Sequence, residues 1–485
     1  MEPVFEFPLD LAKLSHESRV QRLHLQLRAA IVERRLPAGA RLPSTRRVAQ
    51  AYGVARNTVI AAYDLLMAEG FIVTRAGAAA EVVDLGMQAN PSVRKRLPRL
   101  PAQPPAIDWR KAAPSTTHAH PTATRGFELG VPDHRWFPSD VWRRSLLHTT
   151  SFALAGAFGY PPAEGRPLLR AAIAQHVAYA RAVVCDERNV IVTSGAQQAF
   201  DLLARVLVKR GQTKVAIENP GYPPLRAALL AAGAQLVPIP VDDEGLIVER
   251  LPTDTRIVCV TPSHQFPTGV ALSLPRRRAL LDFARRNAAV IVEDDYDGEF
   301  RYGTQPLDAL QTLDRDAKVI YVGTFSKSLF PALRLGYVVA PTWLIAALTA
   351  AKQSADNGGN VALQEALARF ILDGHLARYT RRMRKRYEAR RDTLVRAIEC
   401  ELAAWLIAVP PGAGIHLYAR FRDRRQAKRI VSLVDQHAIG AQPVSDFLVE
   451  RERAAGTGIA FGFGCIDAEE IEASIAGLAR ALHRG

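Results

Sequence analysis

The segment formed by residues 319–337, VIYVGTFSKSLFPALRLGY, most strongly limits what this chain can fold into. Residues 319–322 form an apolar run typical of a buried strand, and Gly-Thr-Phe-Ser leads from it to a lone lysine, Lys327. Ligands of open α/β sheets bind beyond the carboxyl ends of the strands, so Lys327 stands where a site is expected. Partial withdrawal from water lowers the pKa of such an amine and makes it nucleophilic.

Side chains suited to a phosphate accompany this lysine. They are the hydroxyls of Thr324 and Ser326 and the guanidinium group of Arg334. Together they indicate a Schiff-base lysine that holds a phosphorylated aldehyde. The residues S-K-S-L-F-P-A-L-R-L-G resemble the pyridoxal-phosphate lysine segment of fold-type I aminotransferases. The alternative is an ordinary surface lysine after a strand.

Composition sets the outer limits. The 485 residues suffice for two or three domains, and no apolar run approaches the roughly 20 residues that a membrane span needs. The N-terminal residues carry acids and no signal-peptide pattern, so we expect a cytoplasmic protein without a membrane partner. Four cysteines lack metal-ligand spacing, which predicts reduced thiols and no metal site. The net charge of +15 favours a polyanionic partner.

The first 84 residues have the pattern of three helices and a hairpin. An amphipathic helix begins near Val20, Ser44 caps a second helix, and a bend at Gly53 leads to a third helix that closes at Gly70. Two short strands follow. This order predicts a winged helix-turn-helix over residues 1–84, whose third helix enters the major groove of double-stranded operator DNA.

Charge supports a DNA-binding surface on this domain. Six arginines and no acid occur between Arg34 and Tyr63, although a solvated face of a small helical cap is the alternative. The residues expected to contact DNA are Arg41, Ser44, Thr45, Arg46, Arg56, Asn57, Thr58 and, in the wing, Arg75.

The stretches L-P-A-G-A-R-L-P-S-T-R, G-V-A-R-N-T-V and A-Y-D-L-L-M-A-E-G-F-I resemble the DNA-binding domain of GntR-type regulators. The wing reads R-A-G-A-A-A-E where relatives often have R-P-G-S-G-T, so it loses hydroxyls and gains Glu81.

Residues 85–120 contain six prolines and the basic cluster 94–96, which predicts a semi-extended linker. The cluster either attracts DNA non-specifically or only adds solubility.

Residues 121–485 alternate strand and helix patterns, as expected for a doubly wound α/β sheet, with a small subdomain mainly in residues 380–485. A strand candidate runs into a helix through Ser194, and this turn is a natural phosphate cradle because helix N-termini offer free N–H groups. The cradle consists of Gly195, Ala196 and Gln197.

The strand candidate 288–300 ends in acids. Period-2 alternation puts Asp294 and Tyr296 on one face, and Glu293, Asp295 and Asp297 on the other. A carboxylate keeps a pyridine nitrogen protonated, and a phenol bonds the 3-oxygen of the ring, which gives Asp294 and Tyr296 their expected roles. Asp294 precedes Lys327 by 33 residues, enough for a helix-containing crossover to the neighbouring strand.

The aminotransferase resemblance implies further site residues. Tyr222 of E-N-P-G-Y would stack on the cofactor ring, and Tyr160 would reach the cofactor phosphate of the partner subunit in a homodimer. The loop T-P-S-H-Q-F-P-T-G has Phe266 where these enzymes have an asparagine. His264 either replaces that asparagine at the 3-oxygen or is a turn residue without cofactor contact.

The resemblance also points to a missing group. These aminotransferases hold the substrate α-carboxylate with an arginine on a late strand, and alignment of G-T-G-I-A-F-G-F-G puts Ala460 in its place. We therefore expect no efficient transamination of ordinary α-amino acids, although Arg451 or Arg453 folding back is an alternative. Eight basic residues between Arg378 and Arg391 are either a solvated helix face or a second phosphate contact.

A GntR-type reader before an aminotransferase-like body resembles the MocR subfamily. The resemblance implies a transcriptional regulator that binds pyridoxal phosphate through Lys327. The regulator would sense either pyridoxal phosphate itself or an amino compound. It also implies a homodimer, with a domain-swapped form in which each reader packs on the partner's body, and at most weak or half-transamination activity. The alternative is a working aminotransferase with an accessory DNA-binding domain.

Overall fold

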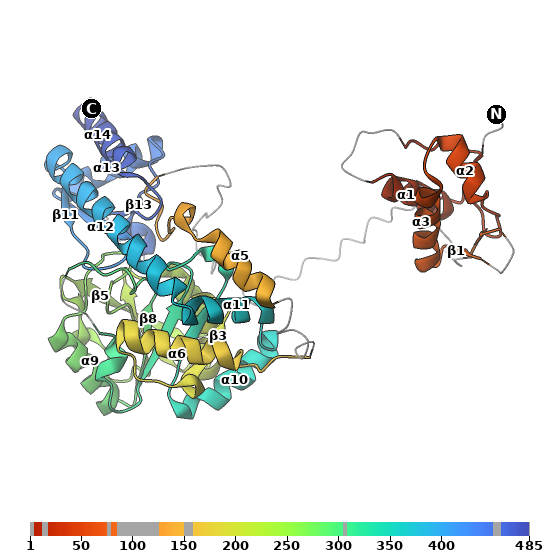
Figure 1. Cartoon of the computed structure of the whole chain (residues 1–485). Coiled ribbons are helices and arrows are strands. Elements are labelled where there is room, and N and C mark those ends of the chain that lie inside the picture. The colour runs from red at the N-terminus through yellow and green to blue at the C-terminus, as the bar shows by residue number, and fades with distance from the viewer. Residues whose placement is uncertain are drawn as a thin grey trace. The chain divides into compact units, whose positions relative to one another are not determined.

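The computed structural model describes residues 4–11, 18–74, 79–84, 126–149, 159–303, 308–449 and 457–484. The chain divides into two compact units, Met1–Pro104 and Pro105–Gly485, which we call the reader and the body (Figure 1). The predicted linker and Arg75 lie outside the described residues. No helix in the described part of the chain is long and apolar enough to cross a membrane.

The reader is the predicted winged helix-turn-helix. It comprises α1 (Arg19–Val32), α2 (Thr45–Tyr52), α3 (Arg56–Ala68) and the antiparallel strands β1 (Ile72–Val73) and β2 (Glu81–Val82). The stripe of α1 that includes Leu23 and Leu27 is buried against Val59 and Leu66 of α3. These apolar residues recur at helical spacing, so their burial fixes the two helices together.

Local signals define the helix ends in the reader. The Ser44 hydroxyl accepts a hydrogen bond from the Arg47 amide at 3.3 Å and caps α2, as predicted. Gly53 ends α2 with φ of +59°, a left-handed conformation that glycine adopts without steric cost. The sharp bend between α2 and α3 depends on this residue.

The centre of the body is a mostly parallel sheet of eight strands in the order β3-β10-β9-β8-β7-β4-β5-β6. The strands are β3 (Val190–Thr193), β4 (Lys214–Asn219), β5 (Gln235–Asp242), β6 (Gly245–Leu246), β7 (Ile257–Val260), β8 (Val290–Asp295), β9 (Val319–Thr324) and β10 (Gly336–Val339). Neighbours from β9 to β5 are parallel, whereas β10 is antiparallel to both β3 and β9. Strands β3, β7 and β9 are buried throughout, because helices cover both faces.

Helices form a layer on each side of this sheet (Figure 1). The cluster on one face joins α7 (Ala196–Leu207), α8 (Pro223–Ala232) and α10 (Thr342–Asp356) to side chains such as Val322. The other face carries α6 (Pro167–Arg181), α11 (Val361–Leu372) and, towards its far edge, α9 (Leu274–Arg286). The body is therefore the three-layer α/β fold that the sequence predicts.

A second, antiparallel sheet has the order β11-β12-β14-β13. Its strands are β11 (Leu406–Val409), β12 (His416–Phe421), β13 (Gln442–Pro443) and β14 (Gly458–Gly462). The other α-helices in the described part of the body are α5 (Ser139–His148), α12 (His375–Glu401), α13 (Ala427–Gln436) and α14 (Ala468–Arg484). The backbone of Phe127 bonds to Ile439 and Gly462, so the start of the body is anchored beside the second sheet.

The connection between β8 and β9 agrees with the expected helix-containing crossover. The two strands are adjacent and parallel, and the described part of their connection contains one 3₁₀ turn, Leu310–Leu313. The Glu293 carboxylate accepts the backbone N–H groups of Leu310 and Gln311 at 2.7 and 2.9 Å. A buried side chain thus stabilises this turn, and the sequence pattern gave no sign of that contact.

Candidate functional site

Lys327 follows the carboxyl end of β9, at the edge where the parallel strands end. Its ammonium group donates to the Gly130 carbonyl oxygen at 2.6 Å. Burial lowers the pKa of Lys327, and the Asp297 and Asp294 carboxylates act against that shift. Gly130 has φ of +72°, and a Cβ atom there would lie 2.6 Å from Nζ, so glycine permits this close approach.

Asp294 lies on the neighbouring strand, where its register partner on β9 is Val322. Its Oδ1 atom is buried and has no hydrogen-bond partner among the described residues. Burial, followed by the charges of Asp295, Asp297 and Glu218, raises the pKa of Asp294 well above its usual value. An unsatisfied buried carboxyl is costly, and a protonated ring nitrogen would supply the missing partner. Asp294 therefore fits the role expected from the sequence.

The residues predicted to bind the phosphate lie close together. Strand β10 pairs with β3 and β9, so that Gly336 is opposite both Thr193 and Thr324. Arg334 donates to the Ser194 carbonyl oxygen at 2.8 Å, and the hydroxyls of Thr324 and Ser326 are 3.0 Å apart.

Gly195 precedes the first helical residues of α7, Ala196 and Gln197, and has φ of +83°. A Cβ atom on Gly195 would come within 3.1 Å of the Arg334 guanidinium group. One position is thus surrounded by hydroxyls, a guanidinium group and the N-terminus of α7. These hydrogen-bond donors suit a phosphate.

Tyr296 and His264 form a hydrogen-bonded pair next to Asp294. The Tyr296 hydroxyl donates to the His264 carbonyl oxygen at 3.0 Å and lies 3.1 Å from His264 Nδ1. The same nitrogen is 2.9 Å from Asp297 Oδ2. His264 therefore lies within the site. Its Nδ1 atom is bonded to a carboxylate, whereas its Nε2 atom is buried and has no hydrogen-bond partner among the described residues.

The predicted placement of Asp297 opposite Tyr296 was wrong. Strand β8 ends at Asp295, and residue alternation holds only in extended strands. Beyond that point the chain turns, so Asp297 points to His264. Asp295 does lie on the other face, where it accepts hydrogen bonds from Arg181 at 2.5 Å and Tyr321 at 2.6 Å.

His416, on β12, is a site neighbour that sequence reasoning missed. Its buried ring lies 4.4 Å from the ring of His264, so the second sheet contacts the site through it. Polar atoms of His264, Asp297 and His416 lie within 4.8 Å of one another. Asp297 is bonded to His264 Nδ1, whereas the Nε2 atoms of both histidines are buried without a hydrogen-bond partner among the described residues. A lone histidine in a strand carries no sequence signal for this contact.

An apolar wall borders Tyr222. Phe266 packs edge-on against Tyr222 at 5.4 Å and against Phe447 at 5.0 Å between ring centroids. Ala460 is fully buried on β14 in the same cluster. The position aligned with the carboxylate-binding arginine thus faces aromatic rings, while Arg451 and Arg453 lie outside the described residues.

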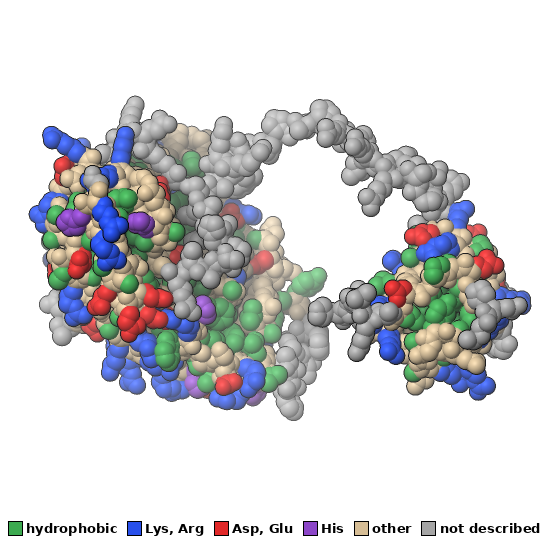
Figure 2. Space-filling view, turned by 90° about the horizontal axis from the view of Figure 1, so that it is seen from above, with side chains coloured by type: hydrophobic (Ala, Val, Ile, Leu, Met, Phe, Trp, Pro, Cys, Tyr) green, Lys and Arg blue, Asp and Glu red, His purple; other side chains and the backbone are tan. Residues whose placement is uncertain are grey.

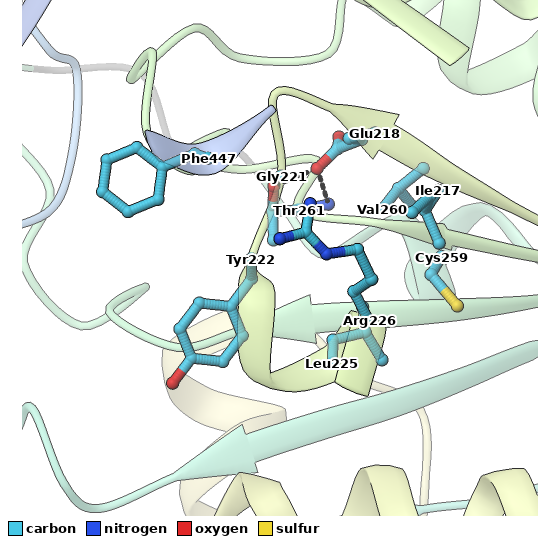
Figure 3. A pocket seen from close by; sticks show the side chains of 10 residues that line it. All are labelled: Ile217, Glu218, Gly221, Tyr222, Leu225, Arg226, Cys259, Val260, Thr261 and Phe447. Atoms are coloured by element: carbon cyan, nitrogen blue, oxygen red, sulfur yellow. Dashed lines mark hydrogen bonds between the residues drawn. The ribbon is translucent and has the colours of Figure 1, made fainter. Parts of the chain in front are cut away.

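A pocket adjoins this wall (Figure 3). Tyr222 and Phe447 lie on one side of it, and Ile217, Val260 and Cys259 lie on the other. The buried Glu218 carboxyl accepts hydrogen bonds from the Thr261 hydroxyl at 2.5 Å and the Thr261 amide at 3.2 Å. Burial raises the pKa of Glu218 to about 7, against the effect of those bonds, so the group is partly protonated at neutral pH. Glu218 was not among the site residues predicted from the sequence.

Tyr160 is 89% exposed in the single chain. Its segment lies against β3, where the Val192 amide donates to the Glu164 carbonyl oxygen at 2.8 Å.

In the reader, the predicted DNA-binding residues gather where α2 and α3 begin. Arg56 is the first residue of α3, and Thr45 is the first residue of α2. The Arg56 side chain donates to the Thr45 hydroxyl at 3.3 Å. Arg41 forms a backbone bridge with Glu81 and so lies beside the wing. Most of this set is exposed, namely Arg41, Ser44, Arg46, Arg56 and Asn57, with Thr45 and Thr58 partly exposed.

The basic run in the body forms part of α12. Its exposed members are Arg378, Arg381, Arg382, Arg384 and Lys385. Arg390 of the same run is instead buried and paired with Asp133 at 2.7 Å. Figure 2 shows Lys and Arg side chains exposed on both units, so the positive charge is not confined to the reader.

Comparison with known proteins identifies both units. Residues 19–82 match the family model of bacterial regulatory proteins of the gntR family, and residues 128–457 match that of aminotransferase class I and II. The body also resembles the kynurenine aminotransferase of Pyrococcus horikoshii, with a TM-score of 0.68 and 28% identity over 74% of this chain and 91% of that one. The body thus has the fold of pyridoxal-phosphate-dependent aminotransferases, and pyridoxal phosphate is its cofactor.

Two relatives share the whole arrangement. The "Probable rhizopine catabolism regulatory protein MocR" of Rhizobium meliloti is 37% identical over 88% of this chain and 86% of its own length. The pyridoxine biosynthesis transcriptional regulator PdxR of Corynebacterium glutamicum is 30% identical over 99% of both chains. The chain therefore belongs to the MocR subfamily of GntR-type transcriptional regulators, in which a winged helix-turn-helix precedes an aminotransferase-like body.

Proposed function

We propose that the body senses pyridoxal phosphate itself, or an amino compound that reacts with it, and that occupancy changes the binding of the reader to operator DNA in the cytoplasm. The cofactor, when bound, supplies an aldehyde that reacts with amines and a ring that withdraws electrons. The observation that carries this proposal is the unsatisfied Asp294 Oδ1 atom beside Lys327, in a chain that also bears a DNA reader.

Each side chain has a role in this proposal. Lys327 binds the aldehyde carbon covalently, and Asp294 pairs with the ring nitrogen. Tyr296 bonds the 3-oxygen with support from His264, and Tyr222 stacks on the ring. The phosphate is held by Gly195, Ala196, Gln197, Thr324, Ser326 and Arg334, with Tyr160 supplied by the partner subunit of a homodimer.

The rival function is that of an aminotransferase with an accessory DNA-binding domain. The similarity of the body to aminotransferases favours it. The apolar surroundings of Ala460 favour the regulator, because an α-carboxylate without an arginine partner loses about 1.5–3 kcal/mol of charge-assisted hydrogen bonding.

The cofactor site yields the first prediction. Lys327→Ala abolishes the covalent adduct that borohydride traps between pyridoxal phosphate and the chain, because no other amine replaces Nζ. Asp294→Ala retains the adduct but weakens cofactor affinity by roughly 10- to 150-fold, the equivalent of about 1.5–3 kcal/mol for a lost charged hydrogen bond. Mass spectrometry and absorbance titration measure these effects. Lys209→Ala, an exposed lysine on the same body, is the matched control, and an adduct that persists in Lys327→Ala would identify a different lysine.

The reader yields the second prediction. Arg56→Ala lowers operator affinity by about 1–3 kcal/mol, because Arg56 is exposed where α3 begins. If its contact is to a phosphate, the slope of log affinity against log salt falls by about 1. Gel-shift titrations at several salt concentrations measure both quantities. Arg19→Ala, at the exposed start of α1, serves as control, and unchanged affinity in Arg56→Ala would place the DNA contacts elsewhere.

The third prediction separates the two functions. Incubation with common α-amino acids and a keto acid gives at most a single half-reaction per site and no sustained turnover. The measurement is steady-state product formation, followed together with the cofactor spectrum. Turnover of about 1 per second or faster would contradict both the alignment on Ala460 and the regulatory role.

The fourth prediction concerns Tyr160. Tyr160→Phe weakens pyridoxal phosphate binding, and mixing this variant with Lys327→Ala restores tight binding to a fraction of the sites. In a mixed dimer, the intact Lys327 of one subunit receives the intact Tyr160 of the other. Absorbance titration of mixed and unmixed samples, with sedimentation to establish dimers, tests this. Simple averaging of the two variants would mean that Tyr160 does not act across subunits.

A further inference from the structure

A buried lysine on α10 has no part in the site described above. Lys352 is 1% exposed, and its ammonium group donates to both carboxylate oxygens of Asp356, at 2.7 and 2.8 Å. Removal of an ammonium group from water costs several kcal/mol, which an ion pair only partly offsets. A buried pair of this kind is therefore better explained by the geometry it imposes than by net stability.

Gln198 connects this ion pair to the phosphate turn. Its Oε1 atom accepts the Ser194 amide at 2.7 Å, and its Nε2 atom donates to Asp356 at 2.8 Å. The Lys352 ammonium group lies 3.4 Å from the same Oε1 atom. A lysine can only donate and a carboxylate can only accept, so the pair allows one orientation of the Gln198 amide. That orientation presents an acceptor to Ser194.

The backbone of Ser194 is thereby held at both of its polar groups, the N–H group of the 193–194 peptide and the carbonyl oxygen of the 194–195 peptide. Gln198 binds the Ser194 N–H group, while Arg334 binds the Ser194 carbonyl oxygen at 2.8 Å. The next peptide units are those of Gly195, Ala196 and Gln197, whose N–H groups lie at the start of α7. A fixed Ser194 peptide fixes the direction of these groups, and hydrogen bonds to a phosphate depend steeply on direction.

The contacts continue from Asp356 to the segment that carries Tyr160. Asp356 accepts the Gly358 amide at 3.1 Å, and Gln364 donates to the Gly358 carbonyl oxygen at 2.8 Å. Gln364 also accepts the Arg166 amide at 2.8 Å. Gly358, with φ of +106°, packs so closely that a Cβ atom there would lie 2.8 Å from Pro161 Cγ.

The ionisation of Asp356 agrees with this arrangement. Burial acts to raise the pKa of Asp356, but hydrogen bonds from Lys352, Gln198 and Gly358 outweigh it and hold the pKa below its usual value. Asp356 is thus charged at neutral pH and acts purely as an acceptor.

We propose that Lys352, Asp356 and Gln198 are positioning residues for the cofactor phosphate, which they orient through the Ser194 peptide without touching the cofactor. Their contacts make the phosphate turn and the residues after Tyr160 one continuous hydrogen-bonded unit. This inference rests on the proposed function, because it presupposes a cofactor phosphate at Gly195.

The test compares two ligands that differ only in the phosphate. Affinities of the full chain for pyridoxal phosphate and for pyridoxal are measured by absorbance titration in the wild type and in Lys352→Met. We expect pyridoxal phosphate to bind roughly tenfold more weakly, as for a loss of about 1.4 kcal/mol, with pyridoxal changed less than twofold. Equal weakening of both ligands, or of neither, would overturn the inference.

Additional variants guard against a folding defect. Lys352→Met leaves Asp356 partly buried without its partner, so the double variant Lys352→Met/Asp356→Leu removes both charges. We expect the double variant to show the same selective loss of affinity for pyridoxal phosphate over pyridoxal. Gln198→Met removes the link to Ser194 and is expected to give the same selective loss. Gln353→Met, at the exposed neighbouring position of α10, should change neither affinity. A wild-type chain that binds neither ligand would instead contradict the proposed function itself.

Discussion

The parallel pairing of β8 with β9 is the constraint on which the site depends. Its register sets Asp294 opposite Val322 and Asp295 opposite Gly323, so the acid-rich end of one strand lies beside the end of the other. Lys327 follows β9 by only a few residues and is therefore brought near Asp294, although 33 positions separate them in the chain. A slip of one residue would turn Asp294 to the opposite face.

Five acids crowd this region, and the fold resolves the charge of each differently. Asp295 pairs with Arg181, Glu293 accepts two backbone amides, and Asp297 bonds to His264. Burial raises the pKa of both Glu218 and Glu293 to about 7. In this group, Asp294 is the acid with a fully buried oxygen that has no hydrogen-bond partner among the described residues. Burial and the neighbouring carboxylates raise the pKa of Asp294, and a cationic partner at its open oxygen would act against that shift.

The sequence predicted these parts to different degrees, for physical reasons. The sequence identified helices with an apolar stripe, such as α1, and strands with an apolar run, such as β9. The spacing of apolar residues along the chain indicates directly which side chains are buried. The location of Lys327 and Asp294 followed from the rule that sites lie at strand ends. The turn of Asp297 to His264 was not predictable, since alternation ends with the strand.

The contacts of His416, Glu218 and Lys352 depend on tertiary packing. His416 comes from a sheet whose position against the first sheet no local pattern specifies. Lys352 reads as a surface residue of an amphipathic helix, because charged residues are rarely buried unless paired, and its partners Asp356 and Gln198 become apparent only in the folded chain.

The position of the site between two sheets gives ligand binding a route to the rest of the molecule. Tyr296 and Asp294 belong to the end of the large sheet, whereas His416 and Ala460 belong to the small one. A ligand can shift a conformational equilibrium only by as much as it binds one state better than another. A ligand that contacts residues of both sheets binds some relative positions of the two sheets more tightly than others. A ligand held by the large sheet alone binds all of these positions equally well. On the proposed function, the contacts of His416 with His264 and of Ala460 with the Phe266 cluster are the places where occupancy of the cofactor site would act on both sheets.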